Sequence, residues 1–205
     1  MKTLARRRAI VAAALVAAFG AVVPSASAAT AGAWTVTPAG AYTAHATYPT
    51  LDLPLMYLEC DYFDVAAGNL EAAGATGGRI GTIDAIAADN CTVAGLEFVM
   101  TQSTTPWQIN LVGPNTSHVN WVDVTIGGIS GHWEGFGCSA DFNGTLYGHY
   151  ENDTGNLVIE GTVSDLVVSN ADCLGIMNNG DVISMNASLH MAMTSTGTSP
   201  VISTP

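Results

Sequence analysis

Basic side chains are almost missing from this chain, which has five lysines and arginines against 17 carboxylates. Four of the five lie within the first eight residues, so Arg79 is the only one in the rest of the sequence. Nucleic-acid binding depends on Lys and Arg to displace counterions from phosphates, and anionic lipid headgroups are held by basic patches. The composition therefore excludes unaided nucleic-acid binding and a basic membrane-surface site.

Motifs of common enzymes and metal proteins are missing as well. The sequence has no C-x-x-C pair, as a zinc knuckle or a thioredoxin-like redox centre requires, and no G-x-S-x-G nucleophile elbow. Beyond the N-terminal region it has no apolar run long enough for a spanning helix. We therefore expect no membrane span, no catalytic residues and no cofactor other than a possible calcium ion.

Residues 1–28 have the three parts of a secretory signal peptide. Lys2 and Arg6–Arg8 form a positive start, Ala9–Val23 is apolar, and Ala26–Ala28 is an A-x-A cleavage site. The apolar run is 15 residues long, shorter than the ~20 residues that a spanning helix needs. We expect export to the extracellular space, and the mature chain then carries one arginine against 17 carboxylates, a formal charge of −16.

The cysteines suit an exported protein. An even number in such a chain favours two disulfides, and four cysteines permit three pairings. Cys60 and Cys91 are 31 residues apart, Cys138 and Cys173 are 35 apart, and the surrounding sequences are similar at an offset of about 80 residues. An internal duplication predicts the pairs Cys60–Cys91 and Cys138–Cys173. Chance similarity among Gly/Thr-rich strands is the alternative.

Hydrophobicity in the mature chain alternates with a period of two. Apolar residues occupy every second position from Ile183 to Met193, which is typical of a strand with one buried face. Similar alternation follows Leu96, Trp107, Val122 and Leu157, and turn residues such as Asn143-Gly144 lie between these stretches. We expect a further strand over Arg79–Ala88, although the spacing of its isoleucines also fits a helix. Gly131–Gly135 is expected to form a loop, and residues 194–205 a flexible tail.

These patterns predict an all-β fold. We expect one domain over residues 29–193, built as an antiparallel β-sandwich or barrel and held by two disulfides, with an internal duplication as its proposed origin.

Several short stretches carry a resemblance to known proteins. The sequence from Cys173 to Asp181, followed by the Ile183–Met193 strand, resembles the C-terminal signature of small secreted proteins from high-GC Gram-positive bacteria, whose function is uncharacterised. The other stretches that match this group are Trp34–Pro38, Asn90-Cys91, Pro106-Trp107 and Gly137–Ala140. The resemblance implies export, two disulfides and a β-rich fold, and it implies no activity.

Four residues are candidates for a binding site. Trp121 falls on the polar face of its predicted strand, and Trp133 lies in the expected loop between His132 and Glu134. An exposed aromatic ring beside carboxylates can stack on a sugar or anchor a protein contact. The alternative is that a neighbouring loop or sheet covers both tryptophans.

Oxygen-rich turns suggest calcium more than any other ion. Glu151, Asp153 and Asn156 place oxygen ligands in one turn, although the spacing does not match an EF-hand loop and hairpin turns are commonly rich in such residues.

Ser130, His132, Ser139 and Asp141 are close in sequence, but serines in Gly-rich β-turns are usually ordinary loop residues. We therefore do not expect them to be catalytic.

The sequence as a whole favours a secreted or surface-associated, non-enzymatic protein with a binding role. The alternatives are a carbohydrate-binding module, a structural self-assembling surface protein and, with less support, a hydrolase. A polysaccharide or a protein is the expected class of partner.

Overall fold

The computed structural model describes residues 33–164 and 166–203, and every regular element in these ranges is a β-strand. The predicted all-β class is confirmed, and so are both predicted disulfides, Cys60–Cys91 and Cys138–Cys173. The expected signal peptide, residues 1–28, lies outside the described residues. No helix in the described ranges is long and apolar enough to cross a membrane.

The strands form a closed antiparallel barrel, which settles the choice between sandwich and barrel. Within the described ranges the chain runs up and down the barrel eight times, and several of these passes are divided into two strands. In chain order the passes are β2 (Gly40–Thr47) with β3 (Thr50–Asp52), β4 (Tyr57–Glu59) with β5 (Tyr62–Leu70), β7 (Arg79–Asp89) with β8 (Cys91–Val93), β9 (Leu96–Gln102) with β10 (Trp107–Pro114), β11 (Trp121–Gly135), β12 (Cys138–Glu151), β13 (Asn156–Ser164) with β14 (Leu166–Asp172), and β15 (Val182–Met193).

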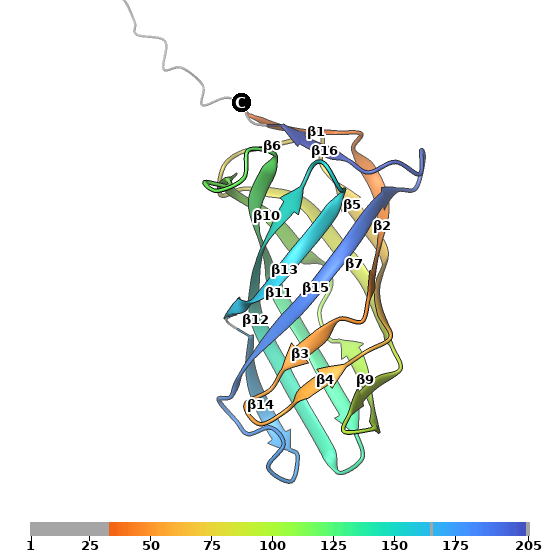
Figure 1. Ribbon diagram of the computed structural model, residues 1–205, viewed down its shortest axis with the longest axis vertical. Coiled ribbons are helices and arrows are strands. Elements are labelled where there is room, and N and C mark those ends of the chain that lie inside the picture. Colours follow the sequence, from red (N-terminus) through yellow and green to blue (C-terminus); the bar gives the residue numbers. More distant parts are fainter. Residues whose placement is uncertain (1–32, 165, 204–205) are drawn as a thin grey trace, which may run out of the picture.

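Each pass pairs with the next one in the chain, and the last pairs with the first. β15 is hydrogen-bonded to both β2 and β3, which closes the ring. The long strands β11, β12 and β15 run along the barrel wall, as Figure 1 shows. An eight-stranded barrel has an interior just wide enough for side chains to fill. The predicted strand over Arg79–Ala88 is confirmed as β7.

Breaks partway along the barrel divide the shorter strands. Tyr48, between β2 and β3, and Asn90, between β7 and β8, have left-handed backbone conformations with φ of 51° and 48°. Backbone hydrogen bonds continue across the breaks, from Tyr48 N–H to the Asp61 carbonyl and from Asp61 N–H to the Asp89 carbonyl. The wall therefore bends at these points without losing its pairing.

One end of the barrel is covered by a small sheet. Its strands are β1 (Trp34–Thr37), β6 (Ala73–Gly74) and β16 (Val201–Ser203), and β1 lies between the other two. We call this the capped end, which is at the top of Figure 1. The expectation of a flexible tail over 194–205 is wrong for the described part, because β16 pairs with β1 and buries Ile202 over the barrel mouth.

The interior of the barrel is filled by apolar side chains. Small gaps among the described residues measure about 10 Å³, beside Tyr150, and about 20 Å³, beside Trp107, and apolar side chains line both. Small-molecule sites usually measure about 300–1,000 Å³, so these gaps are packing voids.

Trp133 was expected in a loop, but it lies within β11 with 2% of its surface exposed. The alternation of buried and exposed residues in β11 continues through Gly131–Gly135, so the side chain of Trp133 points into the barrel, as that of Ile129 does.

A second sequence expectation about turns is wrong. Asn143-Gly144 lies inside β12, opposite a register shift in β11 between Ile126 and Ile129. Gly144 has a φ of 147°, and Gly128 in the shifted stretch has a φ of 71°. These glycines therefore belong to a β-bulge, in which an extra residue in one strand bends the barrel wall. They do not form a hairpin turn.

Candidate functional site

The end of the barrel opposite the small sheet exposes large apolar side chains. Connections 53–56, 94–95, 136–137 and 173–181 all lie there, and we call this the turn end. It is at the bottom of Figure 1, where the β11–β12 hairpin ends and β14 leads into the loop before β15. Each connection carries or adjoins at least one exposed apolar side chain, with exposed fractions of 76% for Leu55, 43% for Leu96, 78% for Phe136 and 84% for Leu174.

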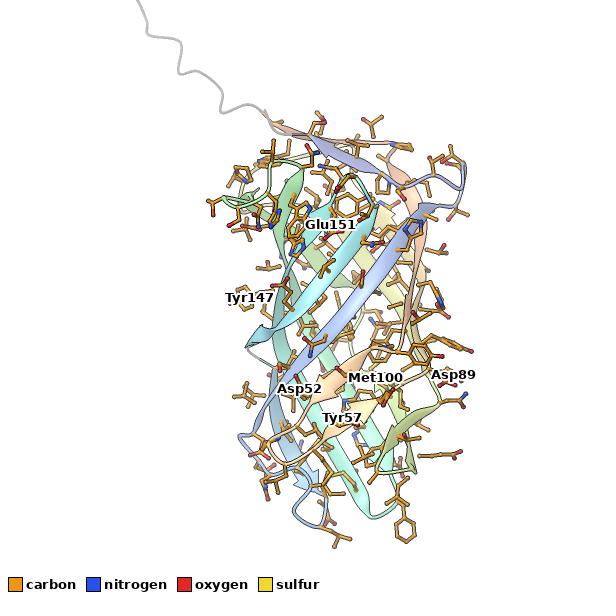
Figure 2. The ribbon with its side chains drawn as sticks, in the orientation of Figure 1. Asp52, Tyr57, Asp89, Met100, Tyr147 and Glu151 are labelled. Carbon is orange, nitrogen blue, oxygen red and sulfur yellow. A yellow bond between two sulfur atoms is a disulfide. The ribbon has the colours of Figure 1, made fainter. Side chains whose placement is uncertain are left out.

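Two hollows lie between these connections. The first, about 470 Å³, is lined by Leu55, Tyr57, Glu59 and the 94–95 turn, where β4 and β8 pair only through Glu59 and Thr92. Figure 2 shows Tyr57 on this lower part of the barrel, beside Asp52, its partner across β3 and β4. The second hollow, about 390 Å³, lies between the β11–β12 turn and Leu174. Both are large enough to receive side chains of a partner.

Charge at the turn end is negative. Exposed carboxylates of Asp52, Glu59, Glu97, Glu134 and Asp172 surround the apolar side chains. Arg79, the sole Lys or Arg among the described residues, begins β7 near the capped end and forms an ion pair with Glu71 at 2.7 Å. The turn end thus combines exposed apolar groups with an acidic surround.

The loop that carries Leu174 is braced internally. The disulfide Cys138–Cys173 ties its first residue to the start of β12. Asp181 accepts a hydrogen bond from the backbone N–H of Asn178, and Asn179 accepts one from the N–H of Ala171. The disulfide and the polar side chains of Cys173–Asp181, the stretch that resembles the bacterial secreted proteins, therefore fix the conformation of this loop.

A serine, a histidine and an aspartate form a chain of contacts on the outer face of β11 and β12. His132 lies directly opposite Asp141, and their Nδ1 and Oδ1 atoms are 2.7 Å apart. On its other side, His132 Nε2 is 3.4 Å from Ser139 Oγ. All three side chains are partly exposed, and Ser139 lines the 390 Å³ hollow. These residues are close in the sequence, and none of them is expected from the sequence to be catalytic.

The contacts of Asp141 favour its ionised form, and with a neutral His132 ring they decide which group donates in each contact. The Asn170 amide donates to Asp141 Oδ2 at 2.8 Å, and together with the His132 ring it lowers the pKa of the Asp141 carboxyl. An ionised carboxylate can only accept, so Nδ1 of His132 donates to it, and a neutral ring then presents an unprotonated Nε2 to Ser139. The Ser139 hydroxyl is therefore the donor in the second contact.

Trp121 lies away from the turn end, at the start of β11, with both ring faces covered. The His118 ring stacks on one face at a centroid distance of 3.7 Å, and the buried His149 ring stacks on the other at 4.1 Å. Glu151, labelled in Figure 2 near the capped end, has its Oε1 atom 3.4 Å from His149 Nε2. A sugar cannot stack on a ring that is covered on both sides.

The predicted binding residues therefore do not form one site. His132 and exposed Glu134 lie near the turn end, Trp121 lies at the opposite end of β11, and Trp133 points into the core. The structure brings His132 to Ser139 and Asp141 instead.

The predicted calcium ligands are bonded to separate partners. Glu151 Oε2 accepts from the Thr154 hydroxyl at 2.6 Å, Asn156 Oδ1 is 3.1 Å from His190 Nδ1, and Asp153 is exposed in the turn. Across residues 33–164 and 166–203, no group of three or more His, Cys, Asp or Glu side chains is placed to hold a metal ion. The geometry gives the calcium hypothesis no added support.

Comparisons with known proteins do not identify the chain. No family model, no curated protein and no solved structure matches it. Function must therefore be inferred from the surfaces described above.

The apolar residues of the turn end were missed at the sequence level. Leu55 follows a proline, and Leu96, Phe136 and Leu174 each adjoin a glycine of a turn. An apolar side chain next to a turn residue breaks the usual polarity of turns, and this signal could have identified all four. Single exposed apolar residues are common, however, and only the fold shows that these share one end.

Proposed function

We propose that this is an extracellular binding protein that recognises its partner with the turn end of the barrel. The observation that carries the proposal is the exposure of Leu55, Leu96, Phe136 and Leu174 from four successive connections at one end. Apolar anchors beside hollows are typical of protein-binding surfaces. Binding at such a surface needs no chemical step.

The charge of the turn end indicates the chemistry of the partner. An acidic surround repels anionic lipids, nucleic acids and other acidic surfaces, and it attracts lysines and arginines. The best-matched partner is a protein surface that offers apolar side chains flanked by positive charge. The brace formed by Cys138–Cys173 supports this role, because a surface ordered before binding loses less conformational entropy.

The alternatives have less support from the geometry. A carbohydrate platform made from Trp121 and Trp133 would need exposed ring faces, whereas one ring is stacked on both sides and the other is buried. Self-assembly through two turn ends would bring two acidic surfaces together, and their repulsion opposes it.

A synthetic amphipathic helix with one leucine face and lysines on the other serves as the probe. Isothermal titration compares the wild type with the triple variant Leu55→Ser/Phe136→Ser/Leu174→Ser, and with Val119→Ser as the control. Val119 is fully exposed in the 115–120 connection at the capped end. We expect the triple variant to bind about tenfold or more weakly, a loss of about 1.4 kcal/mol or more, and the control to bind like the wild type.

A second peptide, with every lysine replaced by glutamate, tests the charge argument. We expect it not to bind measurably. The proposal is wrong if the triple variant binds the lysine peptide as tightly as the wild type, or if both peptides bind equally well. Retention on insoluble polysaccharide that depends on Leu55, Phe136 and Leu174 would also overturn it in favour of a carbohydrate ligand.

A further inference from the structure

The chain of contacts from Asp141 through His132 to Ser139 has a chemical use that the binding proposal does not need. We infer that Ser139 is a nucleophile activated by His132, and that the hollow beside it admits a small carboxylic ester. The site shares its hollow and Leu174 with the turn end. The inference does not depend on recognition there, because it rests on the contacts of His132 with Asp141 and Ser139.

The geometry supplies the parts of a general-base mechanism. A base must lie within reach of the proton that it removes, and His132 Nε2 is 3.4 Å from Ser139 Oγ. Such contacts are often loose before substrate binds. Asp141, 2.7 Å from Nδ1, acts as a positioning residue that holds the ring in the tautomer whose free nitrogen faces the serine. Asn170 in turn fixes Asp141 at 2.8 Å.

The strand pairing explains why these residues meet. His132 and Asp141 are directly opposite on neighbouring strands, and Ser139 is opposite Glu134, two positions along the same face. Diagonal neighbours on one face of an antiparallel pair are within reach of long or ring side chains. The arrangement is therefore held by the register of the β11–β12 hairpin, which the nearby Cys138–Cys173 disulfide braces.

The surroundings of Ser139 define the substrate class. Its hollow of about 390 Å³ is lined by Leu174 and by the carboxylates Glu134 and Asp172. Leu174 can contact a short acyl or aryl group, and the two carboxylates disfavour an anionic substrate. The ligand class is thus an uncharged ester with a short acyl or aryl group.

The reaction balances with water as the only co-reactant. Ser139 Oγ attacks the ester carbonyl carbon, its proton passes to His132 Nε2, and the bond to the leaving oxygen breaks as an acyl-serine forms. The leaving group departs with that proton. Water then attacks the acyl carbon while His132 takes a proton from the water. The bond between that carbon and Ser139 Oγ breaks, His132 returns the proton to Ser139 Oγ, and the free acid is released.

The experiment uses the secreted, disulfide-bonded protein with p-nitrophenyl acetate. Mass spectrometry of proteolytic peptides locates acetyl groups after brief exposure, and absorbance follows release of p-nitrophenol. We expect acetylation at Ser139 in the wild type, none at that peptide in Ser139→Ala, and a rate about 100-fold lower in His132→Gln, as expected for loss of a general base. Asp141→Asn should slow acetylation, and Asp141→Glu should restore part of the rate.

Ser130→Ala is the matched control, because Ser130 is also half-buried and lies two residues before His132 on β11. It should react like the wild type. Acetylation of Ser139 in the wild type no faster than that of Ser130, or an equal rate in His132→Gln, would overturn the inference. The position of the acetyl group in the wild type gives the answer even if a variant fails to fold. A negative result here leaves peptide binding at the turn end unchanged, so the two proposals fail separately.

Discussion

The buried hydroxyl of Tyr150 donates a hydrogen bond to the carbonyl of Pro200, 50 residues further along the chain. Asn152, two residues after Tyr150, makes a second pair of bonds with the backbone of Ile202, at 2.9 and 2.7 Å. These contacts attach the last described strand to β12 and the turn after it, and they explain why the C-terminal segment is ordered.

Tyr150→Phe should lower stability by about 1 kcal/mol, because it leaves the Pro200 carbonyl without its buried donor. Removal of residues 199–205 should cost more, since it uncovers the apolar mouth of the barrel beneath Ile202. Urea unfolding followed by tryptophan fluorescence measures both effects. Tyr57→Phe is the control, because Tyr57 is largely exposed. A midpoint for Tyr150→Phe equal to that of the control would contradict the role given to this bond.

Alkaline pH should destabilise the protein. Burial raises the pKa of both Tyr42 and Tyr150 above the ordinary value of 10.0. The folded state then keeps these phenols protonated where the unfolded chain has lost the protons, so their contribution is complete below pH ~10 and is lost as pH rises through the folded pKa values. Unfolding free energies measured between pH ~8 and ~11 should fall above pH ~10, and fall less steeply in Tyr150→Phe. A flat profile in the wild type would count against this explanation.

Gly148→Ala should destabilise the barrel by about 1–3 kcal/mol, as expected for overpacking. A Cβ at this position would collide with the backbone carbonyl oxygen of Val158 on β13, which cannot move without breaking the sheet. Gly113→Ala is the matched control, because a Cβ there meets nothing within 4 Å. Thermal unfolding compares the two variants. Equal melting temperatures would show that the wall yields more easily than its pairing indicates.

Loss of the Cys138–Cys173 disulfide should loosen the turn end. The double variant Cys138→Ser/Cys173→Ser removes a cross-link between residues 35 positions apart. In the chain-entropy model, such a cross-link stabilises the folded state by about 3–4 kcal/mol. Hydrogen exchange should become faster over residues 173–181. Cys60→Ser/Cys91→Ser serves as the comparison, since it should lower global stability and leave that loop protected. Unchanged exchange in the loop after loss of its own disulfide would contradict the bracing described here.

Alternation of polar and apolar residues was sufficient to predict most of the barrel wall. It identified Ile183–Met193 as a strand and, with the cysteine spacing, led to the correct disulfide pairs. The internal duplication stays a prediction, although each disulfide joins the second and third passes of its own half of the barrel. Closure of the ring could not be predicted, because it depends on pairing between β15 and β2, whose paired residues are 145 to 151 positions apart.

The surface features were harder to predict, for physical reasons. Trp133 is followed by Glu134 and Gly135, a local composition typical of a loop, yet its burial depends on continued pairing with β12 and β9. The contacts of His132 with Asp141 and Ser139 depend on the register of one hairpin, and a shift by a single residue would move them to opposite faces. The order of the C-terminal segment depends on Tyr150 and Asn152, for which local sequence gives no sign.

Closure of the barrel also bears on how the protein resists aggregation. Among the described residues, every barrel strand has hydrogen-bonded neighbours on both sides, and the short strands β6 and β16 are the edge strands of the small sheet. Exposed edges are the templates on which sheets from separate molecules join into aggregates. The ring thus shields the wall of this chain from fibril-like growth, and molecules of it can meet side by side without adding strands to one another.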